Sequence, residues 1–277
     1  MKTCIKKEAI KTRKSIRTYT GEKISAVDKE KIIHYINTDE NLVGIHGKKI
    51  KLQLIEVGEN ISGKIGTYGI IRNAPAFIVA TCKNRKDTLF DCGYIVERLV
   101  LYLEQNGLGT CWLGGTFNRA SLSKKINLPP GEMIPAISPV GYRSEKRSLS
   151  DKMIRKLAKG DSRINFDELF FKETPHAMIE NYDTREALEM VRLAPSASNK
   201  QPWRVMMDAN GDAHFFIHRT PNYGGGKIGY DIQWLDMGIA VAHYEIAVGD
   251  VEFVSHNPAT VNIPDLLEYV ISAKKKR

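Results

Sequence analysis

Apolar residues recur along this chain at two spacings, and each spacing predicts a different element. Ser25 is placed to cap free N–H groups, and isoleucines follow it at helical spacing as far as residue 36. Residues 49–54 alternate polar and apolar side chains, as a half-buried strand does. A short apolar run at residues 76–80 predicts a central strand. Helix and strand therefore alternate from the start.

A long helix is predicted from about residue 88 to residue 106, ended by Gly107. Its apolar residues lie on or near one face: Leu89, Ile95, Val96, Leu99 and Leu103. Residues 110–113 and 134–137 predict further strands. The fold class is therefore α+β.

A similar order of elements begins again after a charged, irregular stretch at about residues 150–180. Asp183 opens a helix with a capping-box-like start, and this helix runs into a stop at Pro195. The apolar segments on either side of Asn210-Gly211 predict a hairpin. A second long helix covers about residues 231–248.

The two long helices share an Asp-x-Gly step, Asp91-Cys92-Gly93 in the first and Asp236-Met237-Gly238 in the second. Glycine inside a helix costs about 1 kcal/mol relative to alanine unless close packing needs it. The repeat therefore favours two helices that cross at these glycines, in a divergent internal duplication. Chance likeness between two amphipathic helices is the alternative.

Composition predicts a folded globular protein, because 42% of the 277 residues are hydrophobic and 26% are charged. No run of about 18 apolar residues exists, and the N-terminus lacks the apolar centre of a secretory signal. We therefore expect a cytoplasmic protein without a membrane segment.

The net charge of +9 favours an anionic partner. Basic residues interleaved with exposed aromatics are missing, as is a nucleic-acid reading module, so nucleotide phosphates fit better than nucleic acid. The terminal run Lys274-Lys275-Lys276-Arg277 predicts a solvated tail.

Other chemical motifs are weak. The cysteines form no CxxC pair and predict neither a metal site nor a disulfide framework: Cys4, Cys82, Cys92 and Cys111. The histidines show no HExxH and no convincing triad partner. The run Gly224-Gly225-Gly226-Lys227 lacks the spacing of a phosphate loop and predicts a flexible one.

Two segments carry chemistry. Arg13, Ser15 and Arg17 alternate, which puts three phosphate donors on one side of an extended segment, although a basic turn alone is typical of a solvated surface. Further along, Pro195 stops a helix and small residues follow, so that the backbone of residues 194–203 can approach a flat ligand. Within this segment Asn199 and Gln201 offer paired donors and acceptors, and Trp203 anchors it in the core. A plain polar loop is the alternative.

Together with Gly107-Leu108-Gly109-Thr110-Cys111-Trp112-Leu113-Gly114-Gly115 and Pro139-Val140-Gly141-Tyr142, these segments resemble the signatures of the nitroreductase family. The match to Ala-Pro-Ser-x-x-Asn-x-Gln-Pro-Trp is the most specific, and Lys14 replaces a family arginine. The resemblance implies an FMN site formed by Arg13, Lys14, Ser15, Arg17, Trp112, Leu113, Gly114, Gly115, Arg163, Pro195, Ser196, Ala197, Asn199 and Gln201. In it Arg163 closes over the phosphate, with Arg147 and Lys146 as substitutes.

In that family the two sets of flavin residues come from different subunits of a dimer, and here they come from different halves of one chain. Residues 37–44 have lost the Pro-Ser-x-x-Asn motif, and no Arg-Ser-x-Arg copy precedes Asp183. The chain therefore resembles the fused, single-chain branch of the TM nitroreductase type. We expect a nitroreductase-like half at residues 1–170, a degenerate one at 171–277, a monomer, and one complete site.

The resemblance implies an NAD(P)H oxidoreductase that passes a hydride to flavin N5 and then, by ping-pong turnover, reduces a nitroaromatic, a quinone or a similar acceptor. It leaves open whether NADH or NADPH is used. The flavin carries the chemistry, so no catalytic residue and no metal is expected. The alternatives are a flavin-binding protein without appreciable turnover, a flavin-free interaction domain, and reductive dehalogenation or flavin fragmentation on the same scaffold.

Overall fold

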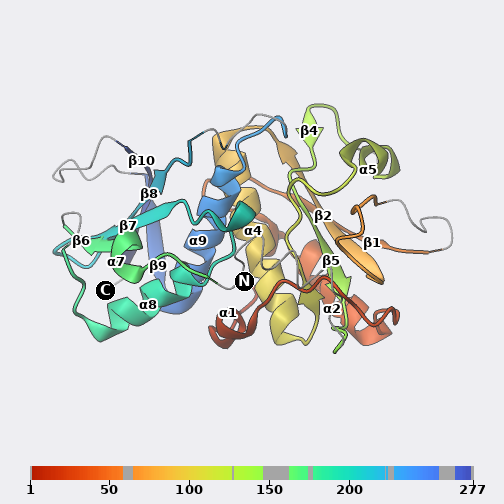
Figure 1. The fold of residues 1–277 in the computed structure, drawn as a ribbon, viewed down its shortest axis with the longest axis horizontal. Helices are drawn as coiled ribbons and strands as arrows, with labels where there is room; N and C mark the ends of the chain where they lie inside the picture. The colour runs from red at the N-terminus through yellow and green to blue at the C-terminus, as the bar shows by residue number, and fades with distance from the viewer. Residues whose placement is uncertain are drawn as a thin grey trace.

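The computed structural model describes residues 2–58, 65–126, 128–145, 162–173, 177–221, 223, 228–255 and 266–275. Figure 1 shows two sheets on opposite sides of a central pair of long helices. Both sheets and both helices follow the alternation that the sequence predicts, so the α+β fold class is confirmed.

The first half builds its sheet around β2, which is buried along most of its length. The strand order is β1-β2-β5-β3, with β4 also paired to β2, and all of these pairings are antiparallel. Its strands are β1 (Lys51–Glu56), β2 (Ala76–Lys83), β3 (Gly109–Thr110), β4 (Glu132–Met133) and β5 (Ile137–Gly141). Its helices are α1 (Glu8–Thr12), α2 (Ala26–Asn37), α3 (Asp39–Leu42), α4 (Lys86–Gln105) and α5 (Arg119–Lys125).

The second half has the strand order β6-β7-β8-β10-β9, in which β6 runs parallel to β7 and the other pairs are antiparallel. Its strands are β6 (Phe170–Lys172), β7 (Trp203–Met207), β8 (Ala213–His218), β9 (Val251–Val254) and β10 (Leu267–Lys275). Its helices are α7 (Phe166–Leu169), α8 (Tyr182–Arg192), the 3-10 turn η1 (Ala197–Asn199) and α9 (Gln233–Val248). The boundary between the two halves after residue 170 stays a prediction, and it falls within β6.

The two halves meet where α4 crosses α9, at the glycines of the repeated Asp-x-Gly step (Figure 1). A Cβ on Gly93 would overlap the carbonyl oxygen of Leu235 and lie 2.8 Å from its carbonyl carbon. A Cβ on Gly238 would overlap the carbonyl oxygen of Phe90 and lie 2.7 Å from the backbone nitrogen of Tyr94. Each glycine therefore packs on the residue three positions before the other glycine. This reciprocal contact is the pattern of a twofold interface, and it confirms the predicted crossing.

Several local predictions are confirmed. The Ser25 side chain accepts a hydrogen bond from the backbone N–H of Asp28 and caps α2. Gly211 takes a φ of 82° in the turn between β7 and β8. Trp203 is fully buried.

Three local predictions are wrong. Asn181, not Asp183, caps α8. Residues 134–136 lie between β4 and β5 and belong to neither strand. Lys274 and Lys275 are not a disordered tail, because they belong to β10 and pair with β9, although their side chains are exposed; Lys276 and Arg277 lie outside the described residues. The long helix α4 is present close to its predicted bounds, and it is buried on nearly every side because α9 also packs on it.

Candidate functional site

Arg13 follows the last residue of α1 in extended backbone, and its side chain is only 6% exposed. Its Nε lies 3.8 Å from Oε1 of Glu97 on α4 and makes no hydrogen bond within the part of the chain that the structure describes. Lys14 is exposed, while Ser15 forms an isolated parallel bridge with Thr110. The alternation predicted from the sequence thus turns Arg13 inward and Lys14 outward.

Glu97 is the centre of a buried polar cluster that joins the two halves. Its Oε2 accepts a 2.6 Å hydrogen bond from Nε1 of Trp112, and its Oε1 lies 2.9 Å from Nε2 of His243 on α9. The other ring nitrogen of His243, Nδ1, donates to the carbonyl oxygen of Met190 at 2.8 Å. Both Glu97 and His243 are 0% exposed. We call Arg13, Glu97, Trp112 and His243 the Glu97 cluster.

The charge of this cluster follows from its geometry. Because Nδ1 of His243 donates to a carbonyl, one proton must also lie between Nε2 and Oε1 of Glu97. Whichever atom holds that proton, the Glu97–His243 pair is neutral overall. The guanidinium of Arg13 therefore keeps its positive charge beside a pair that does not compensate it. A buried cation of this kind suits an anionic ligand.

The segment after α8 has a strained backbone. Ser198, Asn199 and Gln201 have positive φ angles of 49°, 55° and 48°, a conformation that costs of order 1–3 kcal/mol for each such residue. The backbone N–H of Ala197 donates to Oδ1 of Asp236 at 2.9 Å. The backbone N–H of Gln201 donates to Oγ of Ser196 at 2.8 Å. We call residues 194–203 the Pro-Ser loop.

Arg163 lies against this loop. Its Nη2 donates to the carbonyl oxygen of Leu193 at 3.2 Å. The residues beside it hold the loop amides, since Ser162 O accepts from Nδ2 of Asn199 at 3.0 Å and the N–H of Ile164 donates to Oε1 of Gln201 at 3.0 Å. Part of the amide capacity of Asn199 and Gln201 is thus used within the protein, and the predicted role of Arg163 at a phosphate stays a prediction. Lys146 and Arg147 lie outside the described residues.

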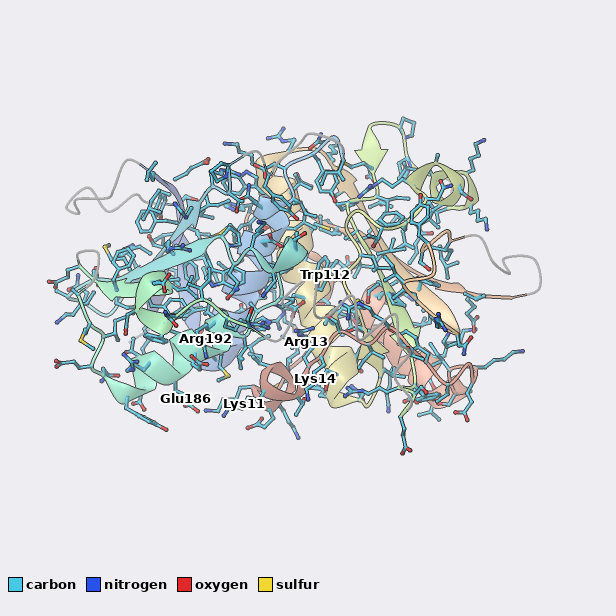
Figure 2. The ribbon with its side chains drawn as sticks, in the orientation of Figure 1. Lys11, Arg13, Lys14, Trp112, Glu186 and Arg192 are labelled. Carbon is cyan, nitrogen blue, oxygen red and sulfur yellow. The ribbon has the colours of Figure 1, made fainter. Side chains whose placement is uncertain are left out.

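An apolar cluster connects the Glu97 cluster to the Pro-Ser loop. Ala9 and Ile10 of α1 pack with Met190 of α8, and Leu193 lies against the same cluster. Two ion pairs link the same helices, because Lys7 and Lys11 both contact Glu186. Figure 2 shows Arg13 and Lys14 between the halves, with Arg192 on the side of α8.

The run from Trp112 to Gly115 also lies at the junction of the halves. Leu113 pairs with Ile137 of the first sheet. A Cβ on Gly114 would lie 2.5 Å from Cδ1 of Ile232, and the Gly114 carbonyl accepts a 3.2 Å hydrogen bond from Oη of Tyr230. Among the described residues, a Cβ on Gly115 would meet Ile228 alone, at 3.8 Å. Gly114 therefore allows a close contact with the end of the Ile232 side chain of the second half.

Comparison with known proteins decides the family. The family model described as "Putative TM nitroreductase" matches residues 6–248. The chain belongs to this family. No match was found among the curated proteins.

Solved structures of nitroreductase family proteins resemble this chain to different extents. A Thermotoga maritima protein described as a "putative nitroreductase" is 20% identical, with a TM-score of 0.60, and the match covers 99% of this chain and 94% of that one. A nitroreductase family protein of Clostridium novyi NT is 24% identical over 52% of this chain and 89% of that one, with a TM-score of 0.42. A nitroreductase of Bacteroides fragilis with bound FMN is 18% identical over 51% of this chain and 90% of that one, with a TM-score of 0.40. The full-length likeness supports the fold of two packed halves.

Sequence reasoning gave no site role to Glu97 or Asp236, and it placed His243 near a site only as an open possibility. Glu97 and His243 are separated by 146 positions, and only the helix crossing brings them together. The repeated Asp-x-Gly step did mark Asp236, but as a sign of duplication and not as a contact of the Pro-Ser loop.

A Ser–His–Asp arrangement also escaped the sequence analysis. Nδ1 of His214 lies 2.7 Å from Oγ of Ser272, and its Nε2 lies 3.4 Å from Oδ2 of Asp208. Ser272 is only 1% exposed, and its hydroxyl also bonds Oη of Tyr269. A buried hydroxyl that is shared in this way cannot attack a substrate. Among the described residues no group of His, Cys, Asp and Glu has the arrangement of a metal site, and none of the described helices combines the length and hydropathy of a membrane span.

Proposed function

We propose that this chain binds one FMN between its halves and is an NAD(P)H-dependent oxidoreductase. The observation that carries the proposal is the guanidinium of Arg13, which is buried, charged and not compensated by the neutral Glu97–His243 pair. The FMN phosphate is a dianion that would supply this missing charge. Membership of the nitroreductase family and the FMN bound by the Bacteroides fragilis relative support the same cofactor.

The residues fit the parts of FMN by their chemistry. We assign the phosphate to Arg13, Lys14, Ser15 and Arg17 on one side and to Arg163 on the other. We assign the flat ring to the backbone of residues 112–115 and to the Pro-Ser loop, where Pro195, Ser196, Ala197, Asn199 and Gln201 approach from the second half. The helix crossing fixes the residues of the first half and those of the second half relative to each other.

FMN supplies the redox chemistry, because it accepts a hydride from NAD(P)H and then reduces an acceptor such as a nitroaromatic or a quinone. The chain binds and orients the FMN, and Glu97 and His243 hold Trp112 and Arg13 in place. No side chain is required as a nucleophile or as an acid–base catalyst. Because one chain provides both sides of the site, the functional unit is a monomer, which sedimentation velocity tests.

The absorption spectrum of the purified protein, with flavin stoichiometry, tests cofactor binding. We expect one FMN per chain after reconstitution. Two per chain would refute the single site, and none would refute flavin binding. Steady-state NADH and NADPH oxidation with menadione or a nitrofuran then tests turnover, and a fully loaded but inactive protein would leave only a flavin-binding role.

Arg13→Ala tests the assignment of the phosphate. Losing a charge-assisted bond worth about 1.5–3 kcal/mol should weaken FMN binding about ten- to a hundredfold. Lys11→Ala is the matched control, because it removes one positive charge from α1 two residues away and should change the FMN affinity little. Equal effects of the two substitutions would mean that only the general charge of this surface matters.

A further inference from the structure

Asp236 is a fully buried carboxyl group that contacts the Pro-Ser loop. Its Oδ1 accepts the backbone N–H of Ala197 at 2.9 Å, while Oδ2 is buried and makes no hydrogen bond within the described chain. Two residues further along α9, Gly238 lies in the contact with α4. The same turn of helix therefore touches both the junction of the halves and the ligand loop.

The first half contains the same device at the equivalent position. Oδ1 and Oδ2 of Asp91 accept the backbone N–H groups of His46 and Lys48 at 3.0 and 2.9 Å. A Cβ on Gly44 would overlap the Asp91 carboxyl, so the backbone of this loop lies directly on it. Residues 43–49 thus correspond to the Pro-Ser loop, but they carry none of the motif. The chain offers a built-in comparison between one Asp under a ligand loop and one Asp under a loop without that role.

The Pro-Ser loop needs an anchor more than most loops do. Three of its non-glycine residues, Ser198, Asn199 and Gln201, have positive φ, and such backbone persists only where the surroundings impose it. The bond from Ala197 to Asp236 lies directly before these residues. It also comes from a rigid helix and not from another loop.

We propose that Asp236 is a positioning residue of the cofactor site, which fixes the Pro-Ser loop to the helix crossing through the N–H of Ala197. This inference rests on the proposed function, because it takes that loop as one wall of the FMN site. Burial raises the pKa of Asp236 to about 8, so the group is a neutral acid at pH 7. An asparagine has the same shape and keeps the accepting oxygen, so it should replace Asp236 without loss of the contact.

The test combines FMN titration with hydrogen exchange on the full chain. In Asp236→Ala we expect FMN affinity, measured by flavin fluorescence, to fall at least about tenfold. In Asp236→Asn it should stay within about threefold of wild type. Asp91→Ala is the matched control, because it removes the equivalent anchor in the first half. It should leave the FMN affinity within about threefold of wild type, even if its melting temperature falls as much as that of Asp236→Ala.

Hydrogen exchange measures the anchor without FMN. Asp236→Ala should speed exchange in the peptide covering residues 194–203, and Asp91→Ala should do so in residues 43–49 instead. Wild-type affinity in Asp236→Ala, an equal loss in Asp91→Ala, or no rescue by Asp236→Asn would overturn the inference. If wild type binds no FMN, the proposed function fails, and unchanged exchange in residues 194–203 of Asp236→Ala would then overturn the anchor separately.

Discussion

The helix crossing gives the sharpest prediction, because the contact between α4 and α9 leaves no space for a methyl group at Gly238. In Gly238→Ala the new Cβ would overlap the carbonyl oxygen of Phe90 and lie 2.7 Å from the backbone nitrogen of Tyr94. Both neighbours are backbone atoms of α4, which cannot turn aside as a flexible side chain does. The two helices must therefore move apart along their contact.

The magnitude follows from two opposing effects. Alanine is the better helix former by about 1 kcal/mol, whereas overpacking of a well-packed core costs about 1–3 kcal/mol or more. A clash with backbone lies at the upper end, so we expect a net loss of about 2 kcal/mol in the free energy of unfolding. For a chain of this size that corresponds to a fall of about 4–8 °C in Tm.

Urea unfolding and thermal melts followed by circular dichroism measure this effect. Gly58→Ala is the control, because a Cβ there meets no atom of the described residues within 4 Å, and it should stay within about 0.5 kcal/mol of wild type. Gly93→Ala should match Gly238→Ala, and the double variant should lose less than the two losses combined, since one separation of the helices accommodates both methyl groups. A Gly238→Ala protein that is as stable as wild type, or more stable, would refute the close crossing.

Two further predictions concern buried carboxyl groups. Glu97→Ala should lower the free energy of unfolding by about 3–5 kcal/mol, because it leaves the buried Nε1 of Trp112 and Nε2 of His243 without their shared partner. Glu97→Gln keeps one donor and one acceptor and should cost clearly less in urea unfolding; equal losses would contradict the cluster. The folded-state pKa of Asp236 is raised to about 8, so its stabilisation is complete below about pH 4 and is lost as the pH rises toward 8. The stability of wild type minus that of Asp236→Asn should therefore fall by about 1.4 kcal/mol per pH unit between pH 5 and pH 7.5, and a flat difference would show that Asp236 is not a neutral acid there.

The sequence predicted the framework of the fold through patterns that depend on local physics. Ser25, Gly211 and Trp203 act as expected because a cap, a turn and a buried aromatic anchor each depend on nearby residues. The glycines of the Asp-x-Gly step predicted the helix crossing, since only close approach explains a repeated glycine inside a helix.

Apart from the helix crossing, side-chain contacts between the halves could not be predicted in this way. The apolar stripe of α4 gave no sign that α9 would also bury Glu97 with His243. Lys274 and Lys275 looked like a solvated run, yet strand pairing with β9 depends on backbone and not on charge. The arginine, small and amide residues of the candidate site were named from family motifs, whereas the partners that hold them come from distant parts of the chain.

The reciprocal packing of Gly93 on Leu235 and of Gly238 on Phe90 has a consequence for how the molecule can vary. In a symmetric homodimer every substitution at such an interface occurs twice, and the subunits separate on dilution. Here the contact is intramolecular, so its strength does not depend on protein concentration, and each side can change alone. The loop that contacts Asp91 and the loop that contacts Asp236 can therefore differ in sequence, as they do, without a change at the helix crossing.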